Sequence, residues 1–262
     1  MLENFGNPNF IVPTPPSGDS SNRVADTEFV TRAIASAIAT ANVTSTIRTV
    51  TKQIFTASGV YTATTGMLFC VIECIGGGGG AGALIGTSGF ALGSAGGGSG
   101  GYSRTLTTTG AIGVSQTVTV GANGTGGANT GLNAGTAGGS TSVGTLCIAK
   151  GGLGGGATSS TAFGDGGGGG PAGVGDLVVV GSPGSPSIYI NNGGSIAPSG
   201  SGGNSFFGGG APAVHGSGSA TNGSTASGYG SGGSGGSCNV TANASGGDGK
   251  SGVVWITEFC ST

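Results

Sequence analysis

The stretch ASGGDGKS, residues 244–251, ends like a phosphate-binding loop and departs from the usual spelling only in starting on alanine. Such a loop binds phosphate when it leaves a buried strand and opens a helix, whose first amides and dipole hold the anion. The residues that follow, GVVWITEF, alternate as a strand does. We therefore expect no nucleotide site, and we interpret Gly246, Gly247 and Gly249 as a turn into a final strand, with Lys250 solvated at its edge.

Other short sequences that match catalytic motifs also lack the secondary structure or the partner residues that those motifs need. GGSGG occurs at 97–101 and 232–236 and matches a nucleophile elbow, but neither copy lies between a clear strand and a helix. The one histidine, His215, is far in sequence from any carboxylate, which disfavours a Ser-His-acid triad. The aspartates do not match the glycine-rich repeat motif that binds calcium. We expect no enzyme, no metal site and no cofactor.

The five cysteines, at 70, 74, 147, 238 and 260, show no paired metal-ligand spacing. In LFCVIECI a period of two places Cys70 and Cys74 on the same face of a strand, where they behave as small core residues. We expect structural free thiols rather than disulfides or ligands.

Glycine contributes 65 of the 262 residues, which is often a mark of disorder. However, 35% of the residues are hydrophobic and only 6% are charged, the opposite of a disordered composition. Seven basic against nine acidic residues form no nucleic-acid-binding stripe, and no apolar run approaches the roughly 20 residues that span a bilayer. We expect an ordered chain with no nucleic-acid partner, no membrane insertion and no secretory signal.

Strand patterns and glycine runs alternate along the chain. Alternating or buried apolar patterns predict strands within 46–62, 67–75, 102–121, 140–150 and 251–259. They bracket three glycine-rich segments at 76–101, 122–139 and 151–249. The fold class expected is mainly β, a β-sandwich with long glycine-rich loops, over 46–262. Runs such as GGGGGAG predict threefold polyglycine helices whose bare backbones bond one another laterally.

The N-terminal part has a different character. Residues 1–25 contain four prolines and no core of their own, and we interpret them as an irregular docking arm. Residues 26–45 begin with DTEFVTRAIASAIATANV, in which apolar residues at fourfold spacing predict one short α-helix. Its narrow Ala/Ile stripe is marginal in isolation, so we expect three copies of the helix to pack together in a homotrimer.

Isolated aromatic residues in the long glycine segments are the best candidates for binding, because rigid aromatics among small residues give contact area at low entropic cost. Some of them could equally fill gaps between glycine helices. Adjacent residues in extended chain point to opposite sides, so one of Phe206 and Phe207 should face outward. The candidate contact residues are Phe206, Phe207, Tyr189, His215, Tyr229 and Phe163.

GDSSNRVADTEFVTRAI, and the series of segments from FTASGVYT to GKSGVVWITEF, resemble parts of bacteriophage tail-fibre and adhesin proteins with a glycine-rich C-terminal domain. GDSSNRVADTEFVTRAI, residues 18–34, resembles the short stretch that precedes the fibre proper, with Asp26 in place of its first threonine. FTASGVYT, GGGSGGYSRTL, SQTVTVGANG and GKSGVVWITEF follow in the order found in the glycine-rich domain. Together they cover nearly the whole chain.

The resemblance implies a virion protein, made in the host cytoplasm, that recognises a bacterial surface polysaccharide or outer-membrane protein through its distal loops. The arm would dock onto a baseplate or tail protein. An alternative is a purely structural baseplate or fibre connector without receptor contact.

Overall fold

The computed structural model describes residues 30, 31, 34, 47–191 and 196–261. The chain divides into two compact units, residues 1–46 and 47–262, and the second holds the glycine-rich domain. The predicted arm, 1–25, and most of the predicted helix, 26–45, lie outside the described residues. Residues 30, 31 and 34 are helical, with Val30 and Ile34 exposed in the single chain.

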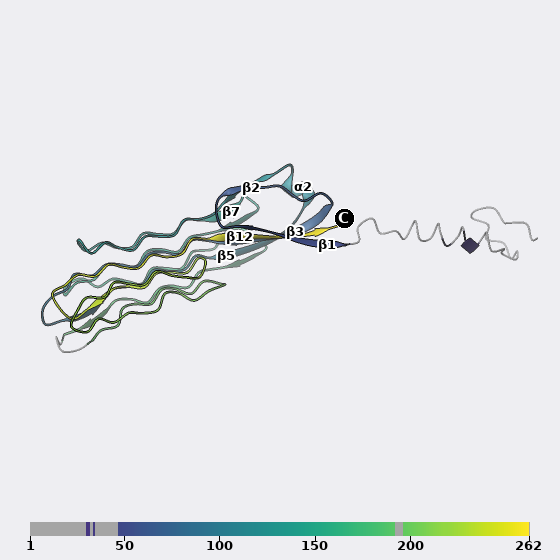
Figure 1. Cartoon of the computed structure of the whole chain (residues 1–262). Helices are drawn as coiled ribbons and strands as arrows, with labels where there is room; N and C mark the ends of the chain where they lie inside the picture. Colours follow the sequence, from purple (N-terminus) through teal and green to yellow (C-terminus); the bar gives the residue numbers. More distant parts are fainter. Residues whose placement is uncertain (1–29, 32–33, 35–46, 192–195, 262) are drawn as a thin grey trace, which may run out of the picture. The chain divides into compact units, whose positions relative to one another are not determined.

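Two antiparallel sheets form a sandwich at one end of the domain (Figure 1). The first has the order β1 (Thr49–Phe55), β12 (Val253–Cys260), β3 (Met67–Ile75), β5 (Tyr102–Thr108) and β9 (Leu177–Val179). The second has the order β2 (Gly59–Tyr61), β6 (Gln116–Thr119), β7 (Thr141–Val143) and β8 (Cys147–Ala149). One short helix, α2 (Thr109–Ile112), follows β5. The mainly β fold class is confirmed.

The core between these sheets consists of the inward-facing residues of each strand. In β12 the buried residues Val254, Ile256 and Glu258 alternate with half-buried ones on the outer face, as a period of two requires. Cys70, Cys74, Cys147 and Cys260 lie in this core, all buried and unpaired. The expectation of free core thiols is confirmed for the first two, and the same packing explains the others.

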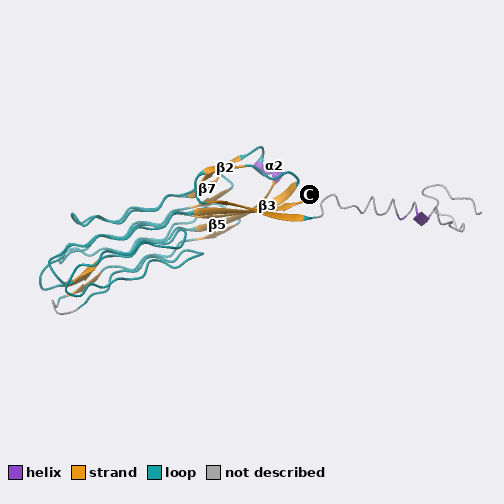
Figure 2. Ribbon diagram, viewed as in Figure 1, coloured by secondary structure: helices purple, strands orange, loops and turns teal. Residues whose placement is uncertain are grey.

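The glycine-rich runs leave the sandwich side by side, drawn as loops in Figure 2. Their hydrogen bonds follow a period of three. Successive amides of 76–84 donate in rotation to three different segments, 95–101, 133–139 and 244–250, at N···O distances between 2.8 and 3.0 Å. A helix with three residues per turn and no internal hydrogen bonds presents its amides in this way. The polyglycine helices expected from the sequence are confirmed.

Carbonyl groups of the same run accept hydrogen bonds in the same rotation, so one helix is surrounded by six others. The segments that donate to 76–84 are 124–127 and 152–158, together with the run that contains Gly233, whose amide donates to the Gly79 carbonyl. The run 94–101 has six neighbours of its own, one of which is 76–84. We call this bundle the polyglycine array.

Glycine is needed in the array for space rather than for unusual backbone angles. Positive φ angles occur at seven described glycines, and Gly79, Gly80 and Gly98 are not among them. A Cβ atom added to Gly79 would lie far inside contact distance of the Leu153 carbonyl, and one on Gly98 would meet Gly168 in the same way. Neighbouring backbones therefore occupy the volume that a side chain would need.

A third sheet lies within the array, at the end away from the sandwich (Figure 2). It consists of β10 (Ile188–Ile190), β4 (Ala91–Gly93) and β11 (Ser237–Cys238). The buried residues Leu84, Leu92, Cys238 and Ala244 form a small core here. The sequence pattern did not predict these strands or β9, because each has two or three residues inside a segment dominated by glycine and serine.

A buried carboxylate ties β1, β2 and β12 together. Glu258 is fully buried and accepts hydrogen bonds from Tyr61 Oη (2.8 Å), Thr51 Oγ1 (2.7 Å), and the Thr64 amide (3.0 Å) and hydroxyl (2.6 Å). Gln53 Nε2 lies 3.4 Å away. Burial alone would raise the pKa of Glu258, but these hydrogen bonds outweigh it and lower the pKa to about 2. The charge is thus stabilised by neutral donors.

Replacing one glycine inside the array should be costly. We predict that Gly79→Ala lowers the free energy of unfolding by about 3 kcal/mol, because the new methyl group overpacks against backbone that cannot rotate away. The measurement is denaturant unfolding. Gly110→Ala in α2 is the control, because a Cβ there meets only the Thr108 hydroxyl at 3.9 Å. Equal stability of the two variants would contradict this explanation of the glycines.

The pKa of Glu258 predicts acid sensitivity. A carboxyl whose pKa is near 4.5 when unfolded and about 2 when folded stabilises the fold fully above pH 4.5, and this stabilisation is lost as the pH falls towards 2. We predict that Glu258→Gln lowers the melting temperature at pH 7 and flattens its pH dependence between pH 2 and 4.5. Calorimetry at several pH values measures this, and a variant with the slope of the natural chain would refute it.

Candidate functional site

The ASGGDGKS stretch is part of the polyglycine array. The amides of Gly246, Gly247 and Gly249 donate to the carbonyls of Gly127, Ser234 and Gly124, at 2.9–3.0 Å. The Asp248 carboxylate accepts from the Gly126 amide at 2.7 Å. These amides have partners in the chain, and strand β12 follows, as expected. The predicted turn is wrong: the stretch is an extended polyglycine run, because its amides alternate between neighbouring runs.

The two GGSGG sequences are also array segments. Ser99 and Ser234 are fully buried, and their hydroxyls accept hydrogen bonds from the amides of Ser182 (2.8 Å) and Ser224 (2.9 Å). His215 lies exposed in a loop. Among the described residues no group of three or more His, Cys, Asp or Glu side chains is placed to hold a metal ion.

The six candidate contact residues fall into two aromatic groups and one separate residue. Phe163 and Tyr189 lie together over the small core of the third sheet, Tyr189 being 5.2 Å from Phe163 and 5.3 Å from Phe90 between ring centroids. Phe163 is 63% exposed. His215 belongs to neither group. We call Phe90, Phe163 and Tyr189 the tip group.

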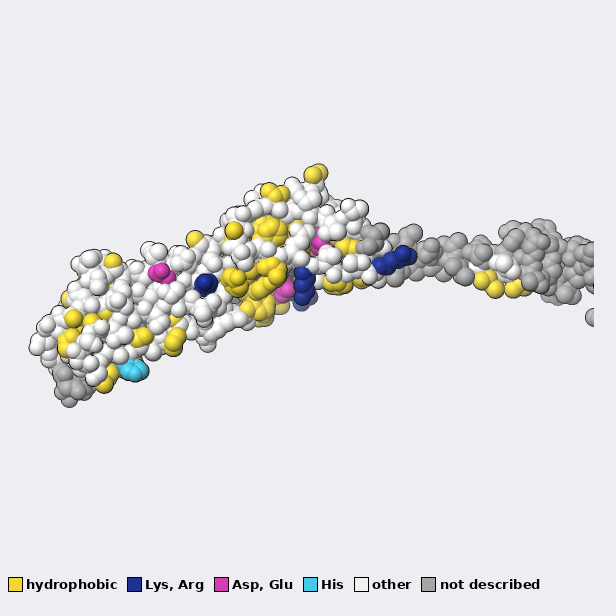
Figure 3. All heavy atoms as spheres, viewed as in Figure 1, with side chains coloured by type: hydrophobic (Ala, Val, Ile, Leu, Met, Phe, Trp, Pro, Cys, Tyr) yellow, Lys and Arg dark blue, Asp and Glu magenta, His cyan; other side chains and the backbone are white. Residues whose placement is uncertain are grey.

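The second group, which we call the aromatic shelf, lies where the first sheet meets the array. It consists of Tyr102, Phe206, Phe207, Tyr229 and Trp255. Phe206 stacks on Tyr102 at 4.1 Å with an interplanar angle of 9°. Phe206 and Phe207 remain 53% and 48% exposed. In Figure 3 hydrophobic side chains gather in this region of the surface, beside acidic and basic atoms.

A tight two-residue turn holds both phenylalanines on the shelf. Ser205 and Gly208 pair with each other across the turn, with the Ser205 amide 2.8 Å from the Gly208 carbonyl. The Ser231 hydroxyl bonds Ser205 Oγ and the Gly208 carbonyl, each at 3.1 Å. The expectation that Phe206 and Phe207 lie in extended chain and point to opposite sides is wrong, because the turn directs both rings towards Tyr102.

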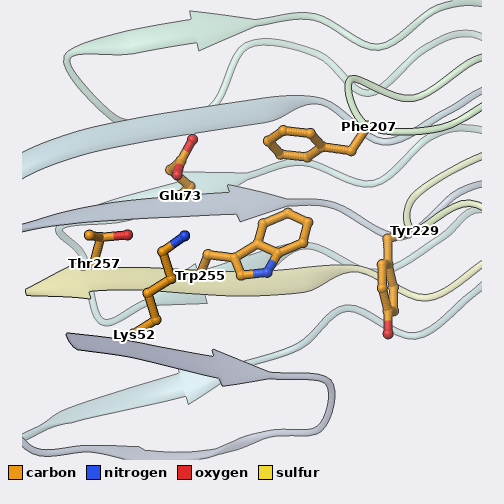
Figure 4. A pocket seen from close by; sticks show the side chains of 6 residues that line it. All are labelled: Lys52, Glu73, Phe207, Tyr229, Trp255 and Thr257. Carbon is orange, nitrogen blue, oxygen red and sulfur yellow. The ribbon is translucent and has the colours of Figure 1, made fainter. Parts of the chain in front are cut away.

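An open pocket of about 340 Å³ is hollowed beside the shelf. Its lining residues, shown in Figure 4, are Lys52, Glu73, Phe207, Tyr229, Trp255 and Thr257. Phe207 and Tyr229 each stand nearly perpendicular to the indole of Trp255, at 79° and 89°, with centroid distances of 4.7 and 6.3 Å. Aromatic surfaces thus form one side of the pocket, and a cation, a carboxylate and a hydroxyl occupy the other. We call it the junction pocket.

The strands of the first sheet place the polar side chains. Register pairs Lys52 of β1 with Thr257 of β12, and Trp255 of β12 with Glu73 of β3, so all four project from the outer face. Tyr102 donates a 2.6 Å hydrogen bond to Glu73 Oε1. Burial, followed by this bond and the negative charge of Glu73, raises the pKa of Tyr102 well above its usual value. Tyr102 therefore stays protonated and orients the carboxylate.

The sequence interpretation missed the pocket residues Lys52, Glu73, Trp255 and Thr257, and also Tyr102, which supports Glu73 from outside the pocket. A signal was available in β12, where VVWITEFC alternates and places Trp255 and Thr257 opposite the buried Val254 and Ile256. Trp255 thus lies on the outer face of the sheet, and tryptophan is enriched at interfaces. The pairing of β1, β12 and β3 that brings the polar residues together is not visible in local sequence.

The model of a glycine-rich domain family matches residues 55–258, from the end of β1 to near the end of β12. The chain belongs to this glycine-rich domain family. The match covers the array, the aromatic shelf and all the sandwich strands except β1, of which it includes only the last residue. No curated protein matches the chain. Within the described part of the chain, no helix has the length and apolar character needed to cross a bilayer.

Proposed function

We propose that this chain is a bacteriophage tail-fibre protein that attaches the virion to the bacterial surface by binding, without catalysis. The observation that carries the proposal is the aromatic shelf, where half-exposed rings are held on a rigid backbone array beside an open pocket. Exposed aromatic clusters on a rigid framework are typical of contact surfaces. The resemblance of residues 18–34 and of the domain to tail-fibre adhesins supports the virion assignment.

In this proposal the receptor is a surface polysaccharide or an outer-membrane protein, and the contact residues lie on the shelf and in the tip group. Residues 1–25 dock onto a baseplate or tail protein. The protein is made in the host cytoplasm, a reducing compartment that suits five free thiols.

A structural connector is the second candidate function. It is favoured by Val50 and Ile54, which are exposed on the edge strand β1 and would suit contact with a neighbouring virion protein. The two functions differ in one measurable property, because a connector would not bind host cells.

We predict that Phe206→Ser combined with Phe207→Ser reduces binding of the purified chain to susceptible cells at least tenfold, since aromatic anchors that a partner covers on binding carry about 2 kcal/mol or more each. Fluorescently labelled protein on susceptible and resistant cells gives the measurement. Val114→Ser is the matched control, because Val114 is a highly exposed apolar residue outside the shelf.

Three outcomes separate the functions. Loss of binding with an unchanged melting temperature supports receptor contact at the shelf. Unchanged binding in the double variant, with loss on Phe163→Ser, would move the contact to the tip group. Absence of binding by the unaltered chain to any susceptible strain would favour the connector.

Deletion of residues 1–25 should leave cell binding of the purified chain intact.

The homotrimer remains a separate prediction. Val30 and Ile34 belong to the apolar stripe of the predicted helix and are exposed in the single chain. We predict that the full chain sediments as a trimer at micromolar concentration, and that Val30→Asp with Ile34→Asp yields monomers with a folded glycine-rich domain, because charges in a three-helix seam are strongly unfavourable. A monomeric natural chain would refute this prediction.

A further inference from the structure

The junction pocket has the composition expected of a site for an uncharged sugar ring. One side offers the aromatic surfaces of Trp255, Phe207 and Tyr229. The other offers Glu73 as an acceptor, Lys52 as a donor and Thr257 as both. A pyranose has the matching division, because axial C–H groups make a face of the ring apolar and able to pack against the negative face of an aromatic ring, while its equatorial hydroxyls need donors and acceptors at the edge.

We propose that the junction pocket binds one pyranose residue of a surface glycan, with its apolar face on the aromatic side chains and its hydroxyls towards Glu73, Lys52 and Thr257. This inference rests on the proposed function and deepens it by naming the ligand class. The volume of about 340 Å³ lies at the lower end of the usual range for small-molecule sites. It suits one or two sugar rings rather than a larger ligand.

The charges of the pocket argue against other small ligands. A quaternary ammonium group would suit an aromatic cage and a carboxylate, but Lys52 adds a positive charge to the same pocket. An anionic ligand would meet Glu73. One cation and one carboxylate leave the lining neutral, which matches a neutral ring that needs both a donor and an acceptor.

The pocket is organised before any ligand binds. Tyr102 holds the Glu73 carboxylate at 2.6 Å, and Phe206 stacks on Tyr102. Phe207 is fixed by the turn that Ser231 ties to the array. Groups that are already ordered lose little entropy on binding, which matters for a weakly binding neutral ligand.

Trp255 is the one tryptophan of the chain, so its fluorescence reports on this pocket alone. The experiment titrates the full chain with methyl glycosides of glucose, galactose, mannose, N-acetylglucosamine and N-acetylgalactosamine, and then with polysaccharide purified from a susceptible strain. We expect a saturable change in Trp255 emission with at least one of these sugars, and tighter binding of the polysaccharide that contains it.

Variants test the assigned contacts. Glu73→Gln should weaken sugar binding about tenfold or more, because a charged acceptor is replaced by a neutral one. Phe207→Ser should weaken it similarly, and Val114→Ser, which changes an exposed apolar residue outside both aromatic groups, should leave it unchanged. No emission change with any glycoside or polysaccharide overturns the proposal, as does equal affinity in Glu73→Gln. A response to an outer-membrane protein preparation but to none of the sugars also overturns it.

The failure of this inference is distinguishable from failure of the attachment function. Binding to susceptible cells without a sugar-dependent change at Trp255 refutes the glycan site and leaves attachment standing. A saturable sugar response in a chain that binds no cells refutes attachment and leaves the glycan site.

Discussion

The close approach of bare peptide backbones is the interaction on which the rest of this structure depends. Each run in the centre of the array gives its amides and carbonyls to six neighbours, and at most positions those neighbours approach so closely that a Cβ atom has no room. Ordering a glycine costs more backbone entropy than ordering any other residue. Hydrogen bonds and contacts distributed over every residue of a run offset this cost, whereas a conventional core concentrates its stabilisation in a few large side chains.

The packing of the array also determines where large side chains can be placed. Its interior accommodates only small residues such as Ala81 and Ser99, so large side chains lie at its surface, in the turns and at the two ends. At one end they form the tip group over the third sheet. At the other, the shelf combines rings from the turn at 206–207 with Trp255 and Tyr102 from strands of the sandwich. Both aromatic groups therefore lie outside the interior of the array because the closely packed backbones leave no room there for aromatic rings.

The sequence was informative where its pattern is local. Alternation in MLFCVIECI and VVWITEFC predicted β3 and β12, and the glycine runs predicted helices with a period of three. It failed where position depends on distant partners. In the sequence Glu258 looks like an ordinary charge near the end of a strand, yet its donors come from β1 and from the residues around β2, between 194 and 207 positions away. The same limit hid the junction pocket, whose polar residues meet only through strand register, and led to the wrong prediction of a turn at Gly246–Gly249.

The pairing of β1 with β12 has a mechanical consequence. The two strands are antiparallel over seven residue pairs, from Thr49 with Cys260 to Phe55 with Val254. Hydrogen bonds in such a ladder are perpendicular to the strands. A tension that pulls β1 lengthwise out of the domain loads these bonds in shear, so several must break together, whereas a sideways pull would open them one at a time. If the chain attaches a virion as proposed, a load that enters the domain along β1 would meet the resistance of the whole ladder at once.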